Sequence, residues 1–446
     1  MSENNLSNKI DEKLPLSRSI TLGFQHALAL YAGAIAVPLV IAGSLGLSPS
    51  QTAMLISAGV FTSGIATLVH NIGIGRYLGV RLPVMMGCAF AVVGAAVAIG
   101  KASGINVMFG SIIAMGIIMM LAAPIVGQLT KYFPHLVTGS IVTIIGITLL
   151  PSAFKSIGGG NLNSPSFGDP VNLLLALIVI VVILISNRFL KGYMQTISVL
   201  LGLFAGTVVA GFMGMLNFSQ VASAKWIEII MPFSFGAPKF EFAGILTLGI
   251  LGVVELTESV GVFSGVADIC KTKLSKKQLI AGLAGEGFAN LLGGIFNAFP
   301  FITYSQNIGL LSLTKVVSRY ATIAGGVILI ILGCMPKVAA LATVIPNSVF
   351  GGAMLVMFSM VSIAGINMLR DVDLSDAGNM LTASLSIGLG VGATLVPTVF
   401  QHCPTVISTI FHSGIVTGAI VAIICNLIFN GDGTKKNMIT ESEQTA

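Results

Sequence analysis

Long apolar runs recur along this chain, and they constrain its fold more than any other feature. Segments of about 20 apolar residues follow one another from Leu22 to Asn430, and a run of that length is enough for one membrane-spanning helix. Only 9% of the 446 residues are charged, whereas a soluble domain carries about a quarter. The pattern predicts an all-α polytopic membrane protein embedded in a lipid bilayer.

The apolar pattern predicts about fourteen membrane segments. They are expected near residues 22–47, 51–72, 83–100, 105–127, 134–153, 172–188, 192–216, 243–265, 279–297, 300–314, 318–340, 345–367, 377–398 and 405–430. With the N-terminus placed in the cytoplasm, 17 of the 22 Lys and Arg residues fall on the inside and 5 on the outside. The outside residues are Lys101, Lys155, Lys225, Lys239 and Lys337. This bias follows the positive-inside rule and predicts a cell (inner) membrane protein with both termini in the cytoplasm. It also accounts for the net charge of +6 without a nucleic-acid partner.

Two of the predicted segments are short and open with a proline. Pro83 and Pro300 lie 217 residues apart, which is close to half the chain. Paired, Pro-interrupted segments at matching places predict inverted repeats whose broken helices meet near the bilayer centre. Two ordinary kinked helices are the alternative. The expected organisation is a cytoplasmic tail (1–20), a first seven-segment repeat (21–216), an extracytoplasmic linker (217–242), a second seven-segment repeat (243–430) and a cytoplasmic tail (431–446).

An unbroken polar run, Thr303 to Asn307, follows Pro300. Irregular backbone survives in a bilayer only where it is buried in protein or lines a wet cavity, so the run predicts a cavity. The amides of Gln306 and Asn307 both donate and accept hydrogen bonds. They also stand where a half-helix would begin, and its free N–H groups suit an anionic or carbonyl-rich ligand.

Three carboxyl residues and one histidine lie within apolar segments. An ionised carboxylate at the bilayer centre costs several kcal/mol, so such residues usually face a pathway or a partner. We predict functional, proton-carrying roles for Glu258 and Glu286, with a structural hydrogen-bonded carboxyl as the alternative. For Glu255 the structural role is favoured. For His26, near the start of the first segment, a site role and a helix-to-helix hydrogen bond are equally supported.

The sequence contains none of the motifs that an enzyme of known chemistry would require. It has no nucleophile elbow, no zinc spacing and no nucleotide loop, and its five cysteines are scattered without metal spacing. We therefore expect no enzymatic activity, no metal and no cofactor.

The stretch "SQNIGLLSLTKVVSR" resembles the signature of the nucleobase–ascorbate transporters, the xanthine/uracil permease family. That signature reads Gln-Asn-x-Gly-x-x-x-x-Thr-Lys, here Gln306, Asn307, Gly309, Thr314 and Lys315. The stretches "QHALALYAG", "ESVG" and "AGEGFANLLGGIFNAFP" also match and follow in the family's order. The resemblance covers nearly the whole chain.

This resemblance implies fourteen segments in two inverted repeats of seven, with a core domain that carries the substrate and a gate domain beside it. It implies short strands in segments three and ten, and homodimers formed through the gate domain. The transported molecule would be a small purine nucleobase, and the proton gradient would supply the energy without any cofactor.

The resemblance also implies roles for residues at matching positions. Glu258 and Gln306 would hold the nucleobase edge by paired hydrogen bonds. Ser305 and Ala89 would offer backbone groups, and Phe90 would stack on the ring.

Three further roles and one departure follow from the same resemblance. Asn307 would shape specificity, Glu286 would couple the proton and His26 would support the site. Many xanthine-selective and fungal relatives carry an aspartate where this chain has Val262, so the chain is more similar to the bacterial xanthine/uric acid permeases. Gln306, where uracil carriers use glutamate, favours an oxidised purine and leaves xanthine and uric acid both open. The alternatives are a uracil or other nucleobase carrier, and an anion transporter or channel of the related sulfate and bicarbonate carriers.

Overall fold

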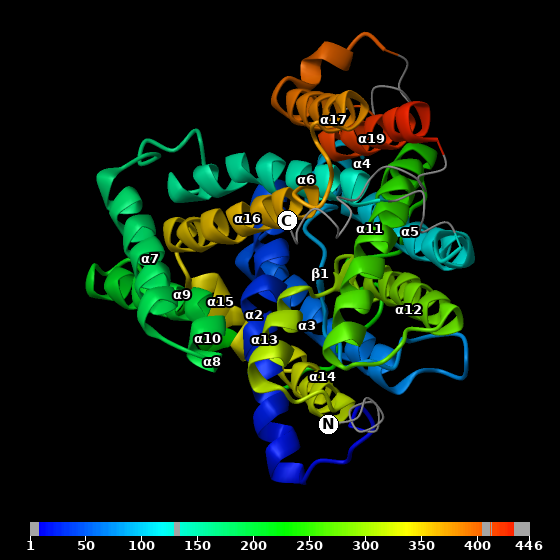
Figure 1. Cartoon of the computed structure of the whole chain (residues 1–446). Helices are drawn as coiled ribbons and strands as arrows, with labels where there is room; N and C mark the ends of the chain where they lie inside the picture. Colours follow the sequence, from blue (N-terminus) through cyan, green and yellow to red (C-terminus); the bar gives the residue numbers. More distant parts are fainter. Residues whose placement is uncertain (1–8, 129–133, 404–410, 412, 432–446) are drawn as a thin grey trace.

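The protein is built almost entirely of helices (Figure 1). The computed structural model describes residues 9–128, 134–403, 411 and 413–431, and the side chain of Gln306 lies outside the described part. Seven described helices are long and apolar enough to cross a membrane, and one pair bent by 79° would make an eighth if it forms a single span. The seven are α2 (Leu16–Leu45), α3 (Pro49–Ile72), α5 (Ile105–Val126), α6 (His135–Ile157), α7 (Pro170–Phe189), α11 (Phe242–Ile269) and α16 (Asn347–Leu369), and the bent pair is α14 (Arg319–Gly333) with α15 (Pro336–Val344).

Other helices occupy the remaining predicted segments. They are α4 (Val93–Ser103), α9 (Ser198–Phe212), α12 (Lys276–Ile295), α13 (Gln306–Thr314), α17 (Ala377–Leu395) and α19 (Gly414–Asn430), with α8 (Tyr193–Thr196), α10 (Ser219–Ser223) and the 3₁₀ turn η2 (Pro397–Phe400) as connections. In chain order, the long helices and these elements fall in the fourteen predicted segments, except that α10 lies in the predicted linker and η2 at the end of segment 377–398. The start of the last one, residues 405–410, lies outside the described residues. Segment 318–340 is interrupted because Pro336, which lacks an N–H, begins the separate helix α15.

Two three-residue strands pair with each other at the centre of the molecule. Strand β1 (Met86–Cys88) pairs antiparallel with β2 (Phe301–Thr303), and Met86 stands opposite Thr303. These two residues are 217 apart, the same spacing that separates Pro83 from Pro300. A residue that faces its own equivalent is the arrangement that a twofold axis between two repeats produces. The predicted strands in segments three and ten are therefore confirmed.

The helix packing repeats in the same inverted manner. Helix α3 packs on α14 as α12 packs on α5, and α2 contacts α14 as α11 contacts α5. Likewise α7 packs on α9 as α17 packs on α19, while α6 and α16 pack on each other. Each of these contacts thus has a counterpart in the other half, which agrees with the predicted inverted repeats rather than with two unrelated kinked helices.

These contacts sort the helices into two groups. The first, which we call the core group, contains α2 to α5 and α11 to α14 together with the strands; the second, the gate group, contains α6, α7, α9, α16, α17 and α19. In Figure 1, α6 and α16 run side by side between α7 with α9 at one end and α17 with α19 at the other. The strands lie on the core side of this arrangement.

Local sequence signals explain how the equivalent helices start. Ser48 and Gln51 form a capping box at the start of α3, and Ser275 and Gln278 form one at the start of α12. Such a box satisfies two of the backbone N–H groups that a helix start leaves unpaired. The two helices that flank the strands are thereby anchored by the same device.

Buried asparagines hold the strands in place. On α12, Asn290 accepts a hydrogen bond from Phe301 N–H at 2.7 Å and donates to Phe301 O at 3.0 Å. On α3, Asn71 donates to Val84 O at 2.7 Å and accepts from the Thr322 hydroxyl at 2.5 Å. Strands this short supply few backbone hydrogen bonds of their own, so the amide side chains complete their pairing.

We expect Asn290→Ala to destabilise the protein, because it leaves both backbone groups of buried Phe301 without a partner. An unsatisfied buried group costs about 1–3 kcal/mol, so the free energy of unfolding should fall by about 2–4 kcal/mol. The measurement is the melting temperature of the detergent-solubilised protein. Asn163→Ala, at an exposed asparagine, is the control. Equal melting temperatures for the two variants would contradict the anchoring role.

Candidate functional site

A small cavity lies where the two strands end, between the core group and the gate group. Its described lining residues are Cys88, Phe90, Ala91, Ile145, Glu255, Glu258, Ile302, Thr303, Tyr304, Ser305 and Val361. We call it the central cavity. Ile145 on α6 and Val361 on α16 come from the gate group, and the rest belong to the core group. Its volume is about 40 Å³, whereas ligand pockets usually measure 300–1,000 Å³. A ligand can therefore enter only if the two groups of helices move apart.

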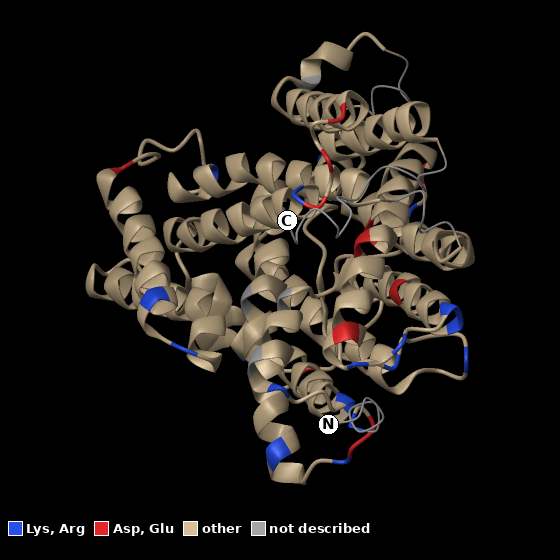
Figure 2. Ribbon diagram, in the orientation of Figure 1, with Lys and Arg blue, Asp and Glu red and all other residues tan. Residues whose placement is uncertain are grey.

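Three carboxyl groups gather at this cavity. Figure 2 shows acidic residues within α11 and α12, whereas most Lys and Arg residues lie in loops and at helix ends. Glu258 is half-buried and lines the central cavity, and fully buried Glu286 lies behind it on α12, where the Ser259 hydroxyl donates to its Oε1 at 2.8 Å. Each of Glu258, Glu255 and Glu286 interacts electrostatically with at least one of the others.

Glu255 differs from what the sequence favours. It lines the central cavity, it is 1% exposed, and neither carboxyl oxygen has a hydrogen-bond partner in the described part of the chain. A structural carboxyl would need such partners, because burying an unpaired polar group costs free energy. The site therefore contains a second cavity-lining carboxyl, one turn before Glu258.

His26 and Asn307 form a hydrogen-bonded chain beside the cavity. Asn307 Nδ2 donates to Pro83 O at 2.9 Å, and His26 Nδ1 lies 2.6 Å from Asn307 Oδ1. Since that amide oxygen can only accept, His26 Nδ1 carries the proton of this bond. The chain ties α2 and the start of α13 to the backbone that leads into β1. His26 thus makes a hydrogen bond between two helices, and its role in the site stays a prediction.

The structure places the other predicted site residues as follows. Phe90 lines the central cavity and makes an edge-to-face contact with Phe358 of the gate group, with ring centroids 5.4 Å apart. Ser305 also lines the cavity. Ala89 does not, and its N–H donates to Pro300 O at 2.8 Å, so this backbone group is already used between the strands. Gln306 is the first residue of α13, directly after Ser305.

The remaining signature residues end the half-helix. The Thr314 hydroxyl donates to Leu310 O at 2.9 Å, and the Lys315 N–H donates to Leu311 O at 2.9 Å. Lys315 has a φ of 53°, in the left-handed region that often terminates helices. Gly309 lies within α13, and like Thr314 and Lys315 it is absent from the described lining of the central cavity.

Tyr304 belongs to the polar run for which the sequence predicts a cavity, but sequence reasoning gave its side chain no role of its own. Its ring packs against two glycines, and a Cβ at Gly87 would come within 2.8 Å of Tyr304 Cδ2. At Gly33, a Cβ would lie 3.2 Å from the Tyr304 hydroxyl. The available signal was the pair of glycines near the strand and the first helix, which leave room for a large side chain.

Glu286 and Thr67 occupy equivalent places in the two repeats. Thr67 lies one turn before Asn71 on α3 and accepts a hydrogen bond from Met86 N–H at 3.0 Å. Glu286 lies one turn before Asn290 on α12, and its carboxyl group faces the backbone of Thr303. Met86 and Thr303 are the paired strand residues. The repeats therefore differ at this point by one titratable group.

Solved structures with the same fold are anion transporters. The transmembrane domain of a cyanobacterium bicarbonate transporter, BicA, matches with a TM-score of 0.61 at 15% identity, covering 94% of this chain and 100% of that one. Murine Solute Carrier 26 family member A9 in the inward-facing state matches with a TM-score of 0.65 at 13% identity, covering 96% and 70%. At these identities the likeness shows the fold alone. The permease family and the relatives named for transport, described next, show that the chain is a membrane transporter and not an enzyme.

Curated relatives identify the family. A uric acid permease, PucJ, of Bacillus subtilis (strain 168) is 45% identical over 92% of each chain. The xanthine permease of the same strain is 42% identical over 96% of this chain and 97% of its own. The uric acid transporter UacT of Escherichia coli (strain K12) is 40% identical over 98% and 91%. The model of the Permease family that contains the xanthine and uracil permeases matches residues 17–399, and the chain belongs to this family, the nucleobase–ascorbate transporters.

Proposed function

We propose that this protein is a proton-coupled symporter that imports an oxidised purine nucleobase, xanthine, uric acid or both, across the cytoplasmic membrane. The observation that carries the proposal is a carboxyl group, Glu258, on a cavity that also contains Phe90 and Ser305 and lies between core and gate. It is supported by relatives named for xanthine and uric acid over more than nine-tenths of the chain.

The proposed roles assign the substrate edge to Glu258 and Gln306. A carboxylate accepts hydrogen bonds and an amide both donates and accepts, so together they match a purine edge with N–H and C=O groups. Phe90 stacks on the ring and Ser305 contributes a backbone group. Ala89 contributes its N–H only if the bond to Pro300 O opens when substrate binds.

The residues behind the cavity act indirectly in this proposal. Asn307 shapes specificity by fixing the start of α13, and His26 holds Asn307 in place. Glu286 carries the coupling proton. The signature residues Gly309, Thr314 and Lys315 set where the half-helix lies and ends.

We further propose the arrangement in the membrane that the charge bias predicts. Both termini lie in the cytoplasm, residues 21–216 and 243–430 form the two repeats, and 217–242 form an extracytoplasmic linker. Two copies associate through the gate domain.

Two other functions remain as alternatives. A uracil or other nucleobase carrier would use the same cavity, but its substrate would present a different arrangement of hydrogen-bond donors and acceptors. An anion transporter is less supported, because no Lys or Arg is found among the described residues that line the central cavity.

The deciding experiment is radiolabelled uptake of xanthine, uric acid, guanine, hypoxanthine and uracil, and of bicarbonate and sulfate, in cells that lack their own carriers. We expect uptake of xanthine, uric acid or both, abolished by an uncoupler. Preferential uptake of uracil would favour the first alternative, and uptake of bicarbonate or sulfate without purines would favour the second.

Gln306→Glu should shift preference from xanthine or urate toward other nucleobases. The change replaces a group that donates and accepts with one that, when ionised, only accepts. Competition of each unlabelled nucleobase against labelled xanthine measures the shift. Gln278→Glu, a capping-box residue of α12 remote from the central cavity, is a matched control. An unchanged competition profile would remove Gln306 from the binding edge.

A further inference from the structure

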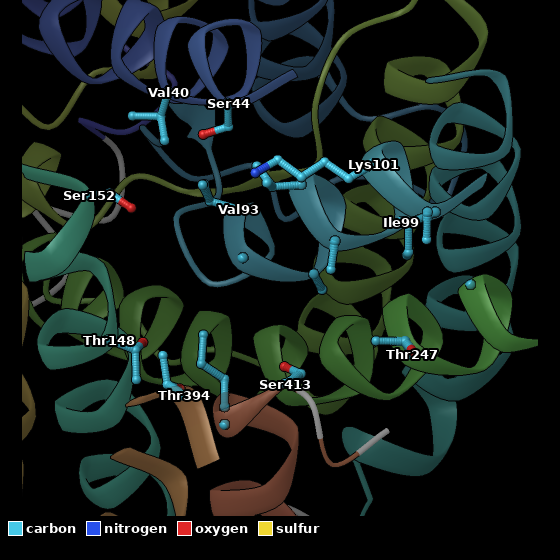
Figure 3. A pocket seen from close by; sticks show the side chains of 18 of the residues that line it. Val40, Ser44, Val93, Ile99, Lys101, Thr148, Ser152, Thr247, Thr394 and Ser413 are labelled. Atoms are coloured by element: carbon cyan, nitrogen blue, oxygen red, sulfur yellow. The ribbon is translucent and has the colours of Figure 1, made fainter. Parts of the chain in front are cut away.

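A second, larger cavity lies between the core and gate groups. Its volume is about 770 Å³, within the range of small-molecule pockets. It is lined by residues of α2, α4 and α11 from the core group and of α6, α17 and α19 from the gate group. Figure 3 shows several of these side chains around the open space. None of its described lining residues belongs to the central cavity.

This cavity leads toward the central one. On α6, Ile145 lines the central cavity, while Thr148, Leu149 and Ser152 line the larger cavity. One helical turn of about 5.4 Å separates Ile145 from Leu149. Similarly, Phe90 lines the central cavity and Val93 lines the larger one. Because Lys101, Ser103 and Glu241 lie at segment ends assigned to the outside, we call the larger space the outer vestibule.

The vestibule combines hydroxyl groups with a single described lysine. Ser44, Thr148 and Ser152 contribute hydroxyls beside the aliphatic side chains of Val40 and Val93 (Figure 3). Lys101, in the last turn of α4, is exposed and extends over the cavity toward Ser44. No carboxylate in the described part of the chain lies within 4.0 Å of its ammonium group. A flat heterocycle with C=O and N–H edges suits such a mixed lining.

One acidic residue shares the vestibule with Lys101. Glu241 Oε2 accepts a hydrogen bond from the Ser103 hydroxyl at 2.6 Å, which holds the carboxyl group at the end of α4. The two charges have opposite sign and lie at the same cavity. They therefore provide a paired test, since each should act on a charged ligand in the opposite direction.

We propose that the outer vestibule is a capture site in which Lys101 attracts an anionic purine before it reaches the central cavity. The inference rests on the proposed function and specifies which substrate form is favoured. Uric acid is a monoanion at neutral pH, whereas xanthine is largely neutral. Lys101 therefore favours urate over xanthine at the first encounter, independently of the hydrogen bonds made in the central cavity.

The test is initial uptake of radiolabelled urate and xanthine at concentrations well below KM. Lys101→Gln should lower urate uptake by about threefold to fivefold, as expected for one partly solvated charge, and leave xanthine uptake unchanged. Lys101→Arg should retain urate uptake. Glu241→Gln keeps an oxygen for the Ser103 hydroxyl and should raise urate uptake. High salt should reduce all these differences, because exposed charges are screened.

Several outcomes would overturn the proposal. Equal loss of urate and xanthine uptake in Lys101→Gln would assign a packing role to Lys101. Unchanged urate uptake in both charge variants would show that the vestibule does not select by charge. If the unaltered protein takes up neither purine, the proposed function itself fails, and this result is distinct from intact but charge-independent uptake.

Discussion

Glu258→Gln is expected to abolish substrate binding and uptake while the protein still reaches the membrane. The carboxyl group lies on the central cavity and is half-buried, so a substrate that enters would meet it directly. A hydrogen bond to a charged group contributes about 1.5–3 kcal/mol, which corresponds to at least a tenfold loss of affinity. Binding of labelled purine to purified protein and uptake in carrier-deficient cells are the measurements.

Glu255→Gln is the matched control for this experiment. It makes the same chemical change on the same helix, one turn earlier, at a residue that also lines the cavity. If Glu258 holds the substrate edge, its loss must exceed the effect at Glu255. Near-normal affinity in Glu258→Gln would assign a structural role to Glu258, and Glu255 would become the stronger candidate for the substrate edge.

The breaks in segments three and ten could be predicted because proline leaves a local signal, whereas the strands were implied only by the family resemblance. Pro83 and Pro300 lack the N–H that a helix interior uses, although Pro38 and Pro151 show that a proline alone need not end a helix here. Around Pro300 the signal is stronger, because polar residues follow it where a membrane helix would be apolar. The spacing of 217 residues between Pro83 and Pro300 also predicts the repeat, and the strand register of Met86 and Thr303 agrees with it. The prolines and the polar run therefore indicate where the two segments are irregular, and the pairing of the two strands depends on both repeats.

From residue chemistry alone, the walls of the cavity could be predicted only where they are polar, and the apolar Phe90 was predicted only through the family resemblance. Glu258 and Ser305 are conspicuous in an apolar chain, whereas Ile145 and Val361 resemble every other aliphatic residue on their helices. A helix that is apolar all round gives no indication of which side faces a neighbour. The contribution of the gate group to the site therefore depends on packing that the sequence does not encode locally.

Glu255 and Ala89 show a different limit. Both lie near a predicted site residue, yet their situation depends on atoms far away in the chain. Among the described residues, Glu255 has no hydrogen-bond partner because no donor of another element reaches it. Ala89 has its N–H occupied because Pro300, in the other repeat, stands opposite. Such facts follow from how the two repeats meet and not from either motif alone.

A comparison of the two repeats distinguishes the residues that hold the strands from the residue that can change its protonation state. Asn71 and Asn290 have the same structural role in the two repeats. Each donates a hydrogen bond to a backbone carbonyl at or before a strand. One turn before them, the first repeat has the hydroxyl of Thr67 and the second has the carboxyl of Glu286. A hydroxyl is sufficient to hold a strand, so the carboxyl is free to serve a further role.

Glu286→Gln is therefore expected to uncouple transport from the proton gradient without abolishing it. Coupling requires a group whose two protonation states favour different conformations of the carrier, and a glutamine has only one such state. The amide oxygen can still accept the bond that Ser259 donates at 2.8 Å, so the local geometry should persist. In proteoliposomes, accumulation of purine against its gradient should fail, while exchange between preloaded vesicles and labelled purine outside should continue.

The comparison with Glu258→Gln makes this result specific. That variant should lose both accumulation and exchange, because it removes a substrate contact and not only a proton site. Thr67→Ser, which keeps a hydroxyl at the equivalent place of the first repeat, should retain both activities. If Glu286→Gln still concentrates purine, and an uncoupler still collapses that gradient, another residue carries the proton. His26 and Glu258 are then the next candidates, because both adjoin the site and both can titrate.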